Sequence, residues 1–186
     1  MLAYVFWHWK RPPIGEPDYE ERQRSFHAAL RASPPDGFIR SSSAALAGAS
    51  WACDGGPSYE DWYFVQDYAA LGHLNEAAIS GSRAAPHQGA ASAAAGGTAG
   101  IYRLWLGDAL RRPRLACWFS RPEGVSYFEL KERLAPVIGR ASGALWMRQM
   151  TLGPAREFCL HAETAVELPP PFAPLTLDLR PVWPDP

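Results

Sequence analysis

The pattern of apolar and polar positions predicts alternating strands and helices in the first half of the chain. Residues 2–9 and 60–66 are rich in aromatic and branched side chains, which is typical of strands. Neither segment alternates cleanly between apolar and polar residues, so we expect both faces of these strands to be buried. The other elements predicted here are a helix over 19–32, a strand over 38–45, a helix over 68–79, a short helix from residue 86 and a strand over 101–106.

Capping and breaking residues delimit these elements. Asp18 is predicted to cap the first helix and Asp67 the second, because a carboxylate can accept the unpaired backbone N–H groups of a first turn. Gly96 and Gly97 are expected to end the weak third helix. The order of elements is then βαββαβ, in which the helices over 68–79 and from residue 86 count as one split helix.

The second half of the chain begins a similar series. The pattern predicts strands over 115–120, 144–151, 157–161 and 175–179, and a helix over 127–138. Residues 152–154 are predicted to form a hairpin turn. Residues 163–168 leave room for no more than a turn or two of helix.

Three short matches in the same order indicate an internal duplication. Each match pairs similar residues at similar places in the two series of elements. The matched segments are 9–12 with 119–122, 38–40 with 146–148, and 61–64 with 157–160. We therefore divide the chain into a first repeat, 1–108, and a shortened second repeat, 113–186, which together form a single compact unit.

Two βαββαβ repeats in one chain resemble the dimeric α/β-barrel superfamily of ferredoxin-like domains, which includes EthD-like proteins and antibiotic monooxygenases. The resemblance implies an α+β fold in which two antiparallel sheets pack as a pseudo-dimeric barrel, with the two usual subunits fused. Members of the superfamily include cofactor-independent monooxygenases, haem-degrading enzymes, isomerases and lyases, and they hold ligands between sheet and helices. No catalytic set of the superfamily matches this sequence residue by residue.

Composition excludes several other classes of protein. The 186 residues carry a net charge of −1, which does not favour nucleic acid or an anionic membrane as the main partner. Three cysteines at wide spacing fit neither a disulfide framework nor a zinc site. The apolar start lacks the basic residues and the cleavage site of a signal peptide, so we expect a cytoplasmic protein. Its expected partner is a small-molecule ligand, and its expected state is a pseudo-dimeric monomer or a homodimer.

His8 is the favoured candidate for acid–base chemistry among the five histidines. It lies between Trp7 and Trp9 on a predicted strand, where an imidazole could shuttle protons or bind haem iron in an apolar pocket. The alternative is a buried, hydrogen-bonded core histidine. His87 is a second candidate because it lies beside an irregular break between helices. His161, near the end of a strand, is a candidate ligand-binding residue, and its alternative is a packing role.

The other two histidines and the serine cluster carry weaker expectations. His27 and His73 are expected on helices in surface or packing roles. His73 and Glu76 would make a poor metal site without further ligands, and we predict no metal. Residues 41–43 are three serines without the surroundings of a nucleophile elbow.

Two arginines are candidates for binding a ligand carboxylate. Arg40 and Arg148 occupy equivalent positions in the proposed repeats, and a guanidinium can bind a carboxylate through two hydrogen bonds. Alternatively, each arginine forms an ion pair across its strands, Arg40 with Asp61 and Arg148 with Glu157.

Aromatic side chains could line the same pocket. Trp7, Trp9 and Trp62 could bind a flat ligand by stacking, or they could simply fill the core. These observations together predict a protein that binds a small apolar or aromatic ligand between sheet and helices. Its reaction would be of the cofactor-independent oxygenase or isomerase type. The alternatives are a haem-binding protein and a non-enzymatic accessory protein.

Overall fold

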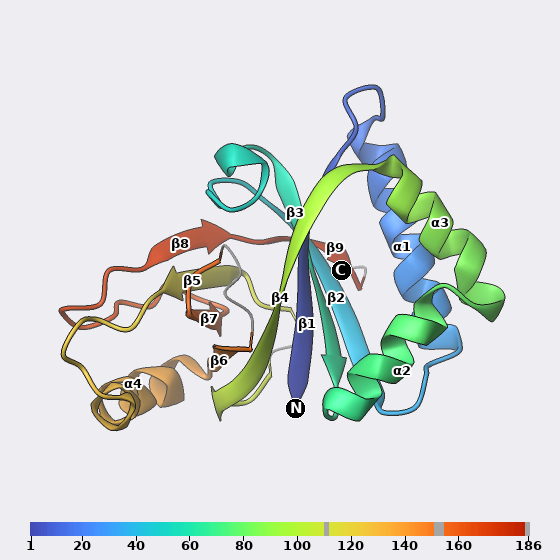
Figure 1. The fold of residues 1–186 in the computed structure, drawn as a ribbon. Coiled ribbons are helices and arrows are strands. Elements are labelled where there is room, and N and C mark those ends of the chain that lie inside the picture. Colours follow the sequence, from blue (N-terminus) through green and yellow to red (C-terminus); the bar gives the residue numbers. More distant parts are fainter. Residues whose placement is uncertain (110–111, 151–154, 185–186) are drawn as a thin grey trace. The chain divides into compact units, whose positions relative to one another are not determined.

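The computed structural model describes residues 1–109, 112–150 and 155–184. The chain divides into two compact units, and each is described by itself (Figure 1). The first unit comprises Met1–Ala99 and Arg180–Pro186, and the second comprises Gly100–Leu179.

The sheet of the first unit has β3 (Ser58–Val65) between β1 (Leu2–Lys10) and β2 (Phe38–Leu46), antiparallel to both. All eight residues of β3 are buried, which agrees with the prediction that both faces of this strand are covered. The complete order of strands in this unit is β4-β1-β3-β2-β9.

Three helices lie against one face of this sheet, α1 (Glu16–Ala32), α2 (Tyr68–Ala78) and α3 (Ala84–Ala93) (Figure 1). Asp67 caps α2 as predicted, because its side chain accepts a hydrogen bond from the N–H of Ala70 at 2.9 Å. The apolar part of the sheet–helix interface consists of Leu2, Phe26, Leu30, Tyr63, Val65, Ala70, Leu74 and Ala90.

The start of α1 differs from the prediction. The helix begins at Glu16 rather than at residue 19, and its N-cap is Gly15, which makes no side-chain hydrogen bond. Pro17 lies in the first turn. A proline there needs no N–H partner and already has the helical φ, so the helix can start three residues before the predicted residue 19.

Strand β4 (Ala94–Gly107) also starts earlier than the predicted residue 101. Gly96 and Gly97, which were expected to end a helix, lie within the strand. A Cβ atom at Gly96 would lie 2.5 Å from the ring of Trp9, and one at Gly97 would lie 2.4 Å from the ring of Phe6. The glycines therefore allow the strand to approach large side chains of β1 closely.

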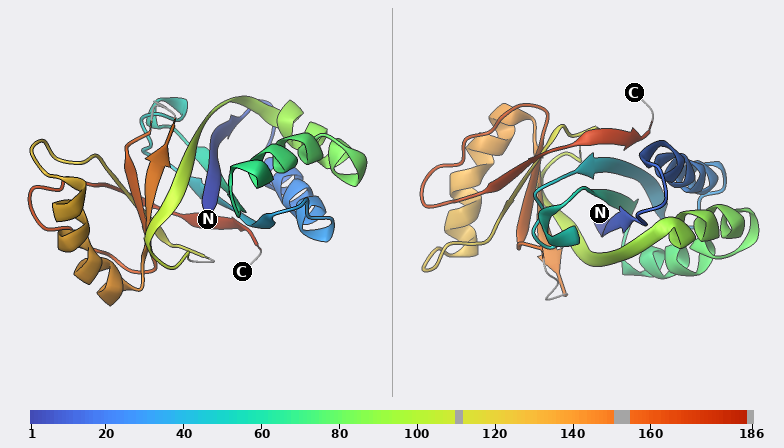
Figure 2. Two further views of the ribbon diagram at one scale, coloured as in Figure 1. Left: turned by 60° about the horizontal axis from the view of Figure 1, so that its bottom comes forward. Right: turned by 90° about the horizontal axis from the view of Figure 1, so that it is seen from above.

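The second unit contains the last part of β4 and the strands β5 (Leu115–Phe119), β6 (Ala144–Gln149), β7 (Phe158–Ala162) and β8 (Leu175–Asp178). Their order is β8-β5-β7-β6-β4. Helix α4 (Tyr127–Ala141) lies against this sheet, as the views in Figure 2 show. Its contact with the sheet is apolar, and it includes Leu130, Leu134, Val137, Ile138, Cys117, Phe119, Leu145, Phe158 and Leu160.

Residues 163–168 contain no helix, which is within the predicted limit of a turn or two. The C-terminal strand β9 (Arg180–Trp183) was not predicted, and it pairs antiparallel with β2. Pro181 obscures this strand in the sequence, but proline is tolerated where a strand lies at the edge of a sheet. The predicted hairpin turn at 152–154 lies outside the described residues.

The two units share the same order of strands across the sheet. Four strands of the first unit are arranged as β4-β1-β3-β2 and four of the second as β8-β5-β7-β6. If β1 and β5 are each counted as strand 1, both arrangements are 4-1-3-2. Each unit has a fifth strand next to the second one, β9 and β4 respectively. The fold is therefore α+β with antiparallel pairing. Within the described ranges, no helix has the length and apolar character needed to cross a membrane.

Candidate functional site

His8 lies on the face of the first unit's sheet that carries the helices. Its ring is 1% exposed. The Nδ1 atom lies 2.6 Å from the hydroxyl of Tyr19 on α1, and the Nε2 atom lies 3.2 Å from Oδ2 of Asp61 on β3. His8 is thus held from both sides, by a hydroxyl and by a carboxylate.

Asp61 is the centre of this cluster. Its carboxylate is 1% exposed. Besides His8, its Oδ2 atom has Nε2 of His27 at 3.4 Å and accepts a hydrogen bond from the hydroxyl of Tyr63 at 2.9 Å. His27 comes from α1, and its Nδ1 atom lies 2.8 Å from Oγ of Ser41 on β2. One carboxylate therefore connects two histidines, each of which also contacts a hydroxyl.

The charges in the cluster favour an ionised Asp61. Burial raises the pKa of its carboxyl, but His8 and His27 lower the pKa more, and it ends well below its usual range. The pKa of Tyr63 is well above its usual value because of burial and the adjacent Asp61 charge. Burial, then Asp61 and Tyr59, raises the pKa of Tyr19 as well. Both phenols therefore keep their protons at neutral pH.

The charge on Asp61 decides which nitrogen of a neutral histidine ring carries the hydrogen. An ionised carboxylate only accepts hydrogen bonds, so a neutral ring facing it carries its hydrogen on Nε2. The Nδ1 atoms are then acceptors for the hydroxyls of Tyr19 and Ser41. The result is two arms, Tyr19–His8 and Ser41–His27, that meet at the carboxylate of Asp61. Each has the order hydroxyl, imidazole, carboxylate, as in a hydrolase triad.

Aromatic rings enclose both arms. Tyr59 stacks on the His8 ring at 5.6 Å between ring centroids. The His27 ring lies parallel to Tyr63 at 5.3 Å and to Trp183 of β9 at 6.1 Å. The cluster is thus built from α1, β1, β2 and β3, and β9 contributes part of its enclosure.

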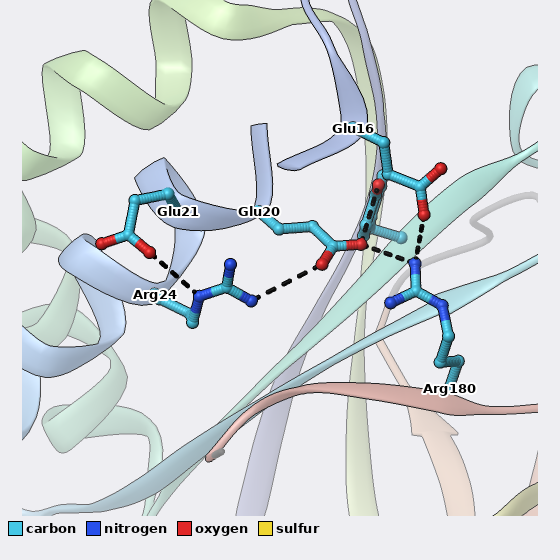
Figure 3. A network of polar contacts seen from close by, with 6 residues as sticks. Glu16, Glu20, Glu21, Arg24 and Arg180 are labelled. Atoms are coloured by element: carbon cyan, nitrogen blue, oxygen red, sulfur yellow. Dashed lines mark hydrogen bonds and ion pairs between the residues drawn. The ribbon is translucent and has the colours of Figure 1, made fainter. Parts of the chain in front are cut away.

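A charged network at the edge of the cluster ties β9 to α1 (Figure 3). The Arg180 side chain donates to Glu16 and to Glu20. Glu20 also accepts from the hydroxyl of Tyr59 at 3.4 Å. Burial raises the pKa of Glu20, but Arg180 and then Arg24 lower it more, so that the net shift is downward. The network therefore connects a ring that stacks on His8 with the protein surface.

Two of the predicted ligand-binding residues, Trp7 and Trp62, lie on the other face of the same sheet. Their indole N–H groups donate to the buried Glu60, Trp7 at 3.2 Å and Trp62 at 3.0 Å. Trp9 is partly exposed and lies against β4. The three tryptophans are therefore separated from the ring of His8 by the sheet.

The predicted arginine pair occupies two different environments. Arg40 is opposite Phe64 in the β2–β3 register, and its guanidinium lies 3.8 Å from that ring's centroid. Asp61 is opposite Ser43 instead. The predicted pairing of Arg40 with Asp61 is therefore wrong, because the two residues lie three positions apart in this register.

In the second unit, the backbone N–H of Arg148 bonds the carbonyl of Glu157 at 2.8 Å, so the two residues do lie opposite each other. The side chain of Arg148 donates to the carbonyl of Ala155. The carboxylate of Glu157 accepts from the hydroxyl of Tyr127 and from the N–H of Arg121.

The remaining two histidine candidates are away from the cluster. His87 on α3 is partly exposed and packs edge-on against Phe26 at 5.2 Å. His161 on β7 belongs to the second unit, is 2% exposed and lies edge-on to Trp146 at 6.5 Å.

Sequence reasoning missed the role of Asp61, His27, Tyr19 and Ser41. One signal was present in the helix. Tyr19, Gln23, Phe26, His27 and Leu30 follow the spacing of a single helical face, and all five are buried. That spacing would have placed His27 toward the sheet. A second signal was Asp61, a charged residue near the start of the predicted strand 60–66, which was otherwise expected to be buried on both faces.

The residues do not fit a metal or haem centre at this cluster. Among the described residues, no group of three or more His, Cys, Asp or Glu side chains is arranged to hold a metal ion. Both ring nitrogens of His8 and of His27 already face protein groups. Neither ring could bind a haem iron without losing a contact to Asp61 or to a hydroxyl.

Comparison with known proteins gives a fold but no sequence family. No family model matches the chain, and no curated protein matches it. A solved structure from Fusobacterium nucleatum, named "Putative monooxygenase", is similar with a TM-score of 0.62 and 9% identity, covering 97% of this chain and 92% of its own.

Two other solved structures show lower similarity. One, named "Putative Chlorite dismutase", has a TM-score of 0.49 and 10% identity over 97% of this chain and 95% of its own. The other, an anthrone oxidase-like protein, has a TM-score of 0.48 and 8% identity over 88% of this chain and 73% of its own. The Fusobacterium structure shows that this chain shares its fold over nearly the whole of both chains.

Proposed function

We propose that the chain binds a small, largely apolar ligand at the sheet–helix interface of the first unit and transfers a proton there. The reaction would be of the cofactor-independent oxygenase or isomerase type. The observation that carries this proposal is the position of His8, which has the hydroxyl of Tyr19 on one ring nitrogen and the ionised Asp61 at the other.

The arrangement supports general base catalysis. Tyr19 accepts a proton from the ligand while its own hydroxyl proton passes to Nδ1 of His8, and the electron pair of the broken bond stays on the ligand. His8 becomes an imidazolium, and Asp61 stabilises that charge at 3.2 Å. The raised pKa of Tyr19 makes its oxygen a strong acceptor once its proton has begun to leave.

His27 provides a second arm on the same carboxylate. Its contact with Ser41 repeats the hydroxyl–imidazole pairing of Tyr19 with His8. We infer that His8 reacts and that His27, held between Tyr63 and Trp183, fixes the carboxylate in place.

The fold is consistent with this proposal, but the proposal depends on the contacts of His8 and not on the fold. The Fusobacterium nucleatum protein of the same fold is named a monooxygenase, which matches one of the two reaction types. The similar strand orders of the two units also support the proposed duplication, with repeats at 1–108 and 113–186. A cytoplasmic location and a pseudo-dimeric monomer or homodimer complete the proposal.

The first experiment is native mass spectrometry of the protein purified gently from its own host. We expect the 20.5 kDa chain with an additional small organic mass. The released compound is then identified and tested for turnover with the wild type, His8→Gln and the control His73→Gln, whose side chain is exposed on α2.

The expected result is a loss of turnover in His8→Gln of about 10²–10⁴-fold, the usual contribution of a general base. The control keeps the wild-type rate. If His8→Gln converts the compound as fast as the wild type, His8 is not the base. If the compound binds unchanged without turnover in any variant, the chain is a binding or accessory protein rather than an enzyme.

A further inference from the structure

The two oxygens of the buried Asp61 carboxylate have unequal surroundings. Oδ2 has three polar neighbours, His8, His27 and Tyr63. Oδ1 has no hydrogen-bond partner among the described residues and is inaccessible to solvent. A charged oxygen buried without a donor is costly, and native proteins usually supply one.

The hydroxyl oxygen Oγ of Ser43 is also buried and has no hydrogen-bond partner within the described ranges. Ser43 is 3% exposed and is directly opposite Asp61 in the β2–β3 register, so both side chains point to the same face of the sheet. On its other side it is opposite Trp183 of β9. Ser43 is thus placed between the carboxylate and the ring that stacks on His27.

The distance between the side chains of two directly opposite residues leaves room for one oxygen atom between Ser43 and Asp61. Cβ atoms of directly opposite residues in an antiparallel pair are about 4.5–5.5 Å apart. Ser43 and Asp61 make no direct hydrogen bond, whereas an oxygen about 2.8 Å from each side chain would join them. The Nε2 atoms of His8 and His27 also lack a well-aligned bond, although they lie near Oδ2. Asp61 Oδ1 and Ser43 Oγ are therefore two buried oxygens without a hydrogen-bond partner on directly opposite residues of β3 and β2.

The negative charge of Asp61 determines which kind of molecule could bind between Asp61 and Ser43. The ionised carboxylate repels anions and requires a hydrogen-bond donor. A water molecule fits, because buried waters bind where two to four otherwise unsatisfied polar groups meet. We propose that Asp61 Oδ1 and Ser43 Oγ hold one internal water molecule, and that Ser43 is a positioning residue for the Asp61 charge.

The role of this water in catalysis rests on the proposed function, but the site itself does not. A donor on Oδ1 stabilises the ionised form of Asp61, which in turn stabilises the imidazolium formed on His8. Loss of the Ser43 hydroxyl removes one of the groups that fix the water. The carboxyl of Asp61 should then protonate at a higher pH than in the wild type.

The test is a crystal structure of the wild type at a resolution that shows ordered water, together with Ser43→Val and Ser42→Ala. We expect a single peak about 2.6–3.2 Å from both Asp61 Oδ1 and Ser43 Oγ in the wild type. Ser43→Val, which fills the region with a methyl group, should lose the peak. Ser42→Ala should keep it, because residue 42 points to the other face of the same strand.

Three outcomes in the wild type would overturn the proposal. These are no peak, an elongated peak that fits a larger ligand, and a peak about 2.0–2.2 Å from the histidine nitrogens, which is a metal distance. A second readout is the carboxyl ¹³C signal of Asp61 followed by NMR as the pH is lowered. Its titration should move to higher pH in Ser43→Ala and stay unchanged in Ser42→Ala, whether or not the protein proves to be an enzyme.

Discussion

In both units a helix packs on a sheet of the same strand order, but the side chains between helix and sheet differ in polarity. In the second unit, α4 contacts β5, β6 and β7 through an apolar cluster that includes Leu134, Phe158 and Leu160. In the first unit, the interface of α1 with β1, β2 and β3 contains the charged and polar cluster of His8, His27 and Asp61. Both clusters are fully buried.

This difference shows which interactions are sufficient to hold a helix on such a sheet, and that the polar cluster of the first unit is an addition to them. The second unit shows that apolar packing is sufficient to hold a helix on a sheet of this order. A buried charge costs desolvation, and apolar replacements of buried ion pairs are often neutral or stabilising. The cluster of the first unit is therefore not explained by stability, and perturbed buried groups of this kind gather at functional sites.

The helices also differ at their starts. Helix α4 begins with a capping box, in which Ser126 and Glu129 satisfy each other's backbone N–H groups. Helix α1 has no side-chain cap. Its first turn is instead tied to β9 by the ion pairs of Arg180 with Glu16 and Glu20. Tertiary contacts replace local capping in the first unit.

The largest expected effect comes from removing the shared charge. Asp61→Ala leaves His8, His27 and Tyr63 without their common partner, and we expect a loss of about 3–5 kcal/mol in the free energy of unfolding. Leu134→Ala in the second unit should cost a similar amount, about 2–5 kcal/mol, through the cavity it creates. Urea unfolding at pH 7 measures both.

The pH dependence then distinguishes these two variants. The folded pKa of Asp61 is lower than the unfolded value of about 4, so its contribution is complete above that pH and is lost as the pH falls toward the folded pKa. The deficit of Asp61→Ala should shrink below about pH 4, while that of Leu134→Ala stays constant. Parallel pH curves for the two variants would contradict the charged state of Asp61.

A second variant converts the interface of the first unit into one like that of the second. The triple variant His8→Phe, His27→Leu, Asp61→Leu removes the shared carboxylate and both imidazoles at once. We expect stability equal to the wild type or higher by about 1–4 kcal/mol. Thermal and urea unfolding measure it. A triple variant that is less stable than Asp61→Ala would show that the first unit needs its polar cluster to fold.

The contrast between the two helix starts predicts a smaller effect. Ser126→Ala removes the side-chain cap of α4 and should cost about 1 kcal/mol of unfolding free energy. The same experiment on Asp18→Ala in α1 should cost less, because Asp18 is not the cap of that helix. Equal losses for the two variants would remove the distinction between local and tertiary capping.

The smallest expected effect concerns the ion pairs of β9. Arg180 is 53% exposed, so Arg180→Gln should cost about 0.5 kcal/mol, and less in high salt. The pKa of Glu20 should rise toward its usual value, since Arg180 contributes to lowering it. Urea unfolding at low and high salt, with NMR titration of Glu20, measures these changes. A salt-independent loss would indicate that packing rather than charge is involved.

The elements were largely predictable because local signals agree with the fold. The lack of alternation in β3 correctly indicated a strand buried on both faces, and Asp67 was correctly identified as the cap of α2. Errors occurred where tertiary contacts outweigh local preference. Gly96 and Gly97 were expected to end a helix, but they lie in β4 because large rings of β1 require residues without a Cβ atom there.

The candidate site was predictable only in part. His8 was identified from its place among tryptophans, yet its contacts are Tyr19 and Asp61 on the other side of the sheet from Trp7. The pairing of Arg40 with Asp61 was wrong because the register of β2 on β3 places Ser43, not Arg40, opposite Asp61. A sequence shows which residues occupy a strand, but the alignment of two strands depends on both of them.

The sequence by itself determined the order of helices and strands, because hydrophobic period, caps and breakers act within a few residues. It also determined that His8 lies on a strand and His27 on a helix. Only the tertiary structure decided that they meet at Asp61 and that the last strand, β9, places Trp183 against His27. These contacts join residues as far apart as 27 and 183, and their strength comes from burial and charge, which no local pattern contains.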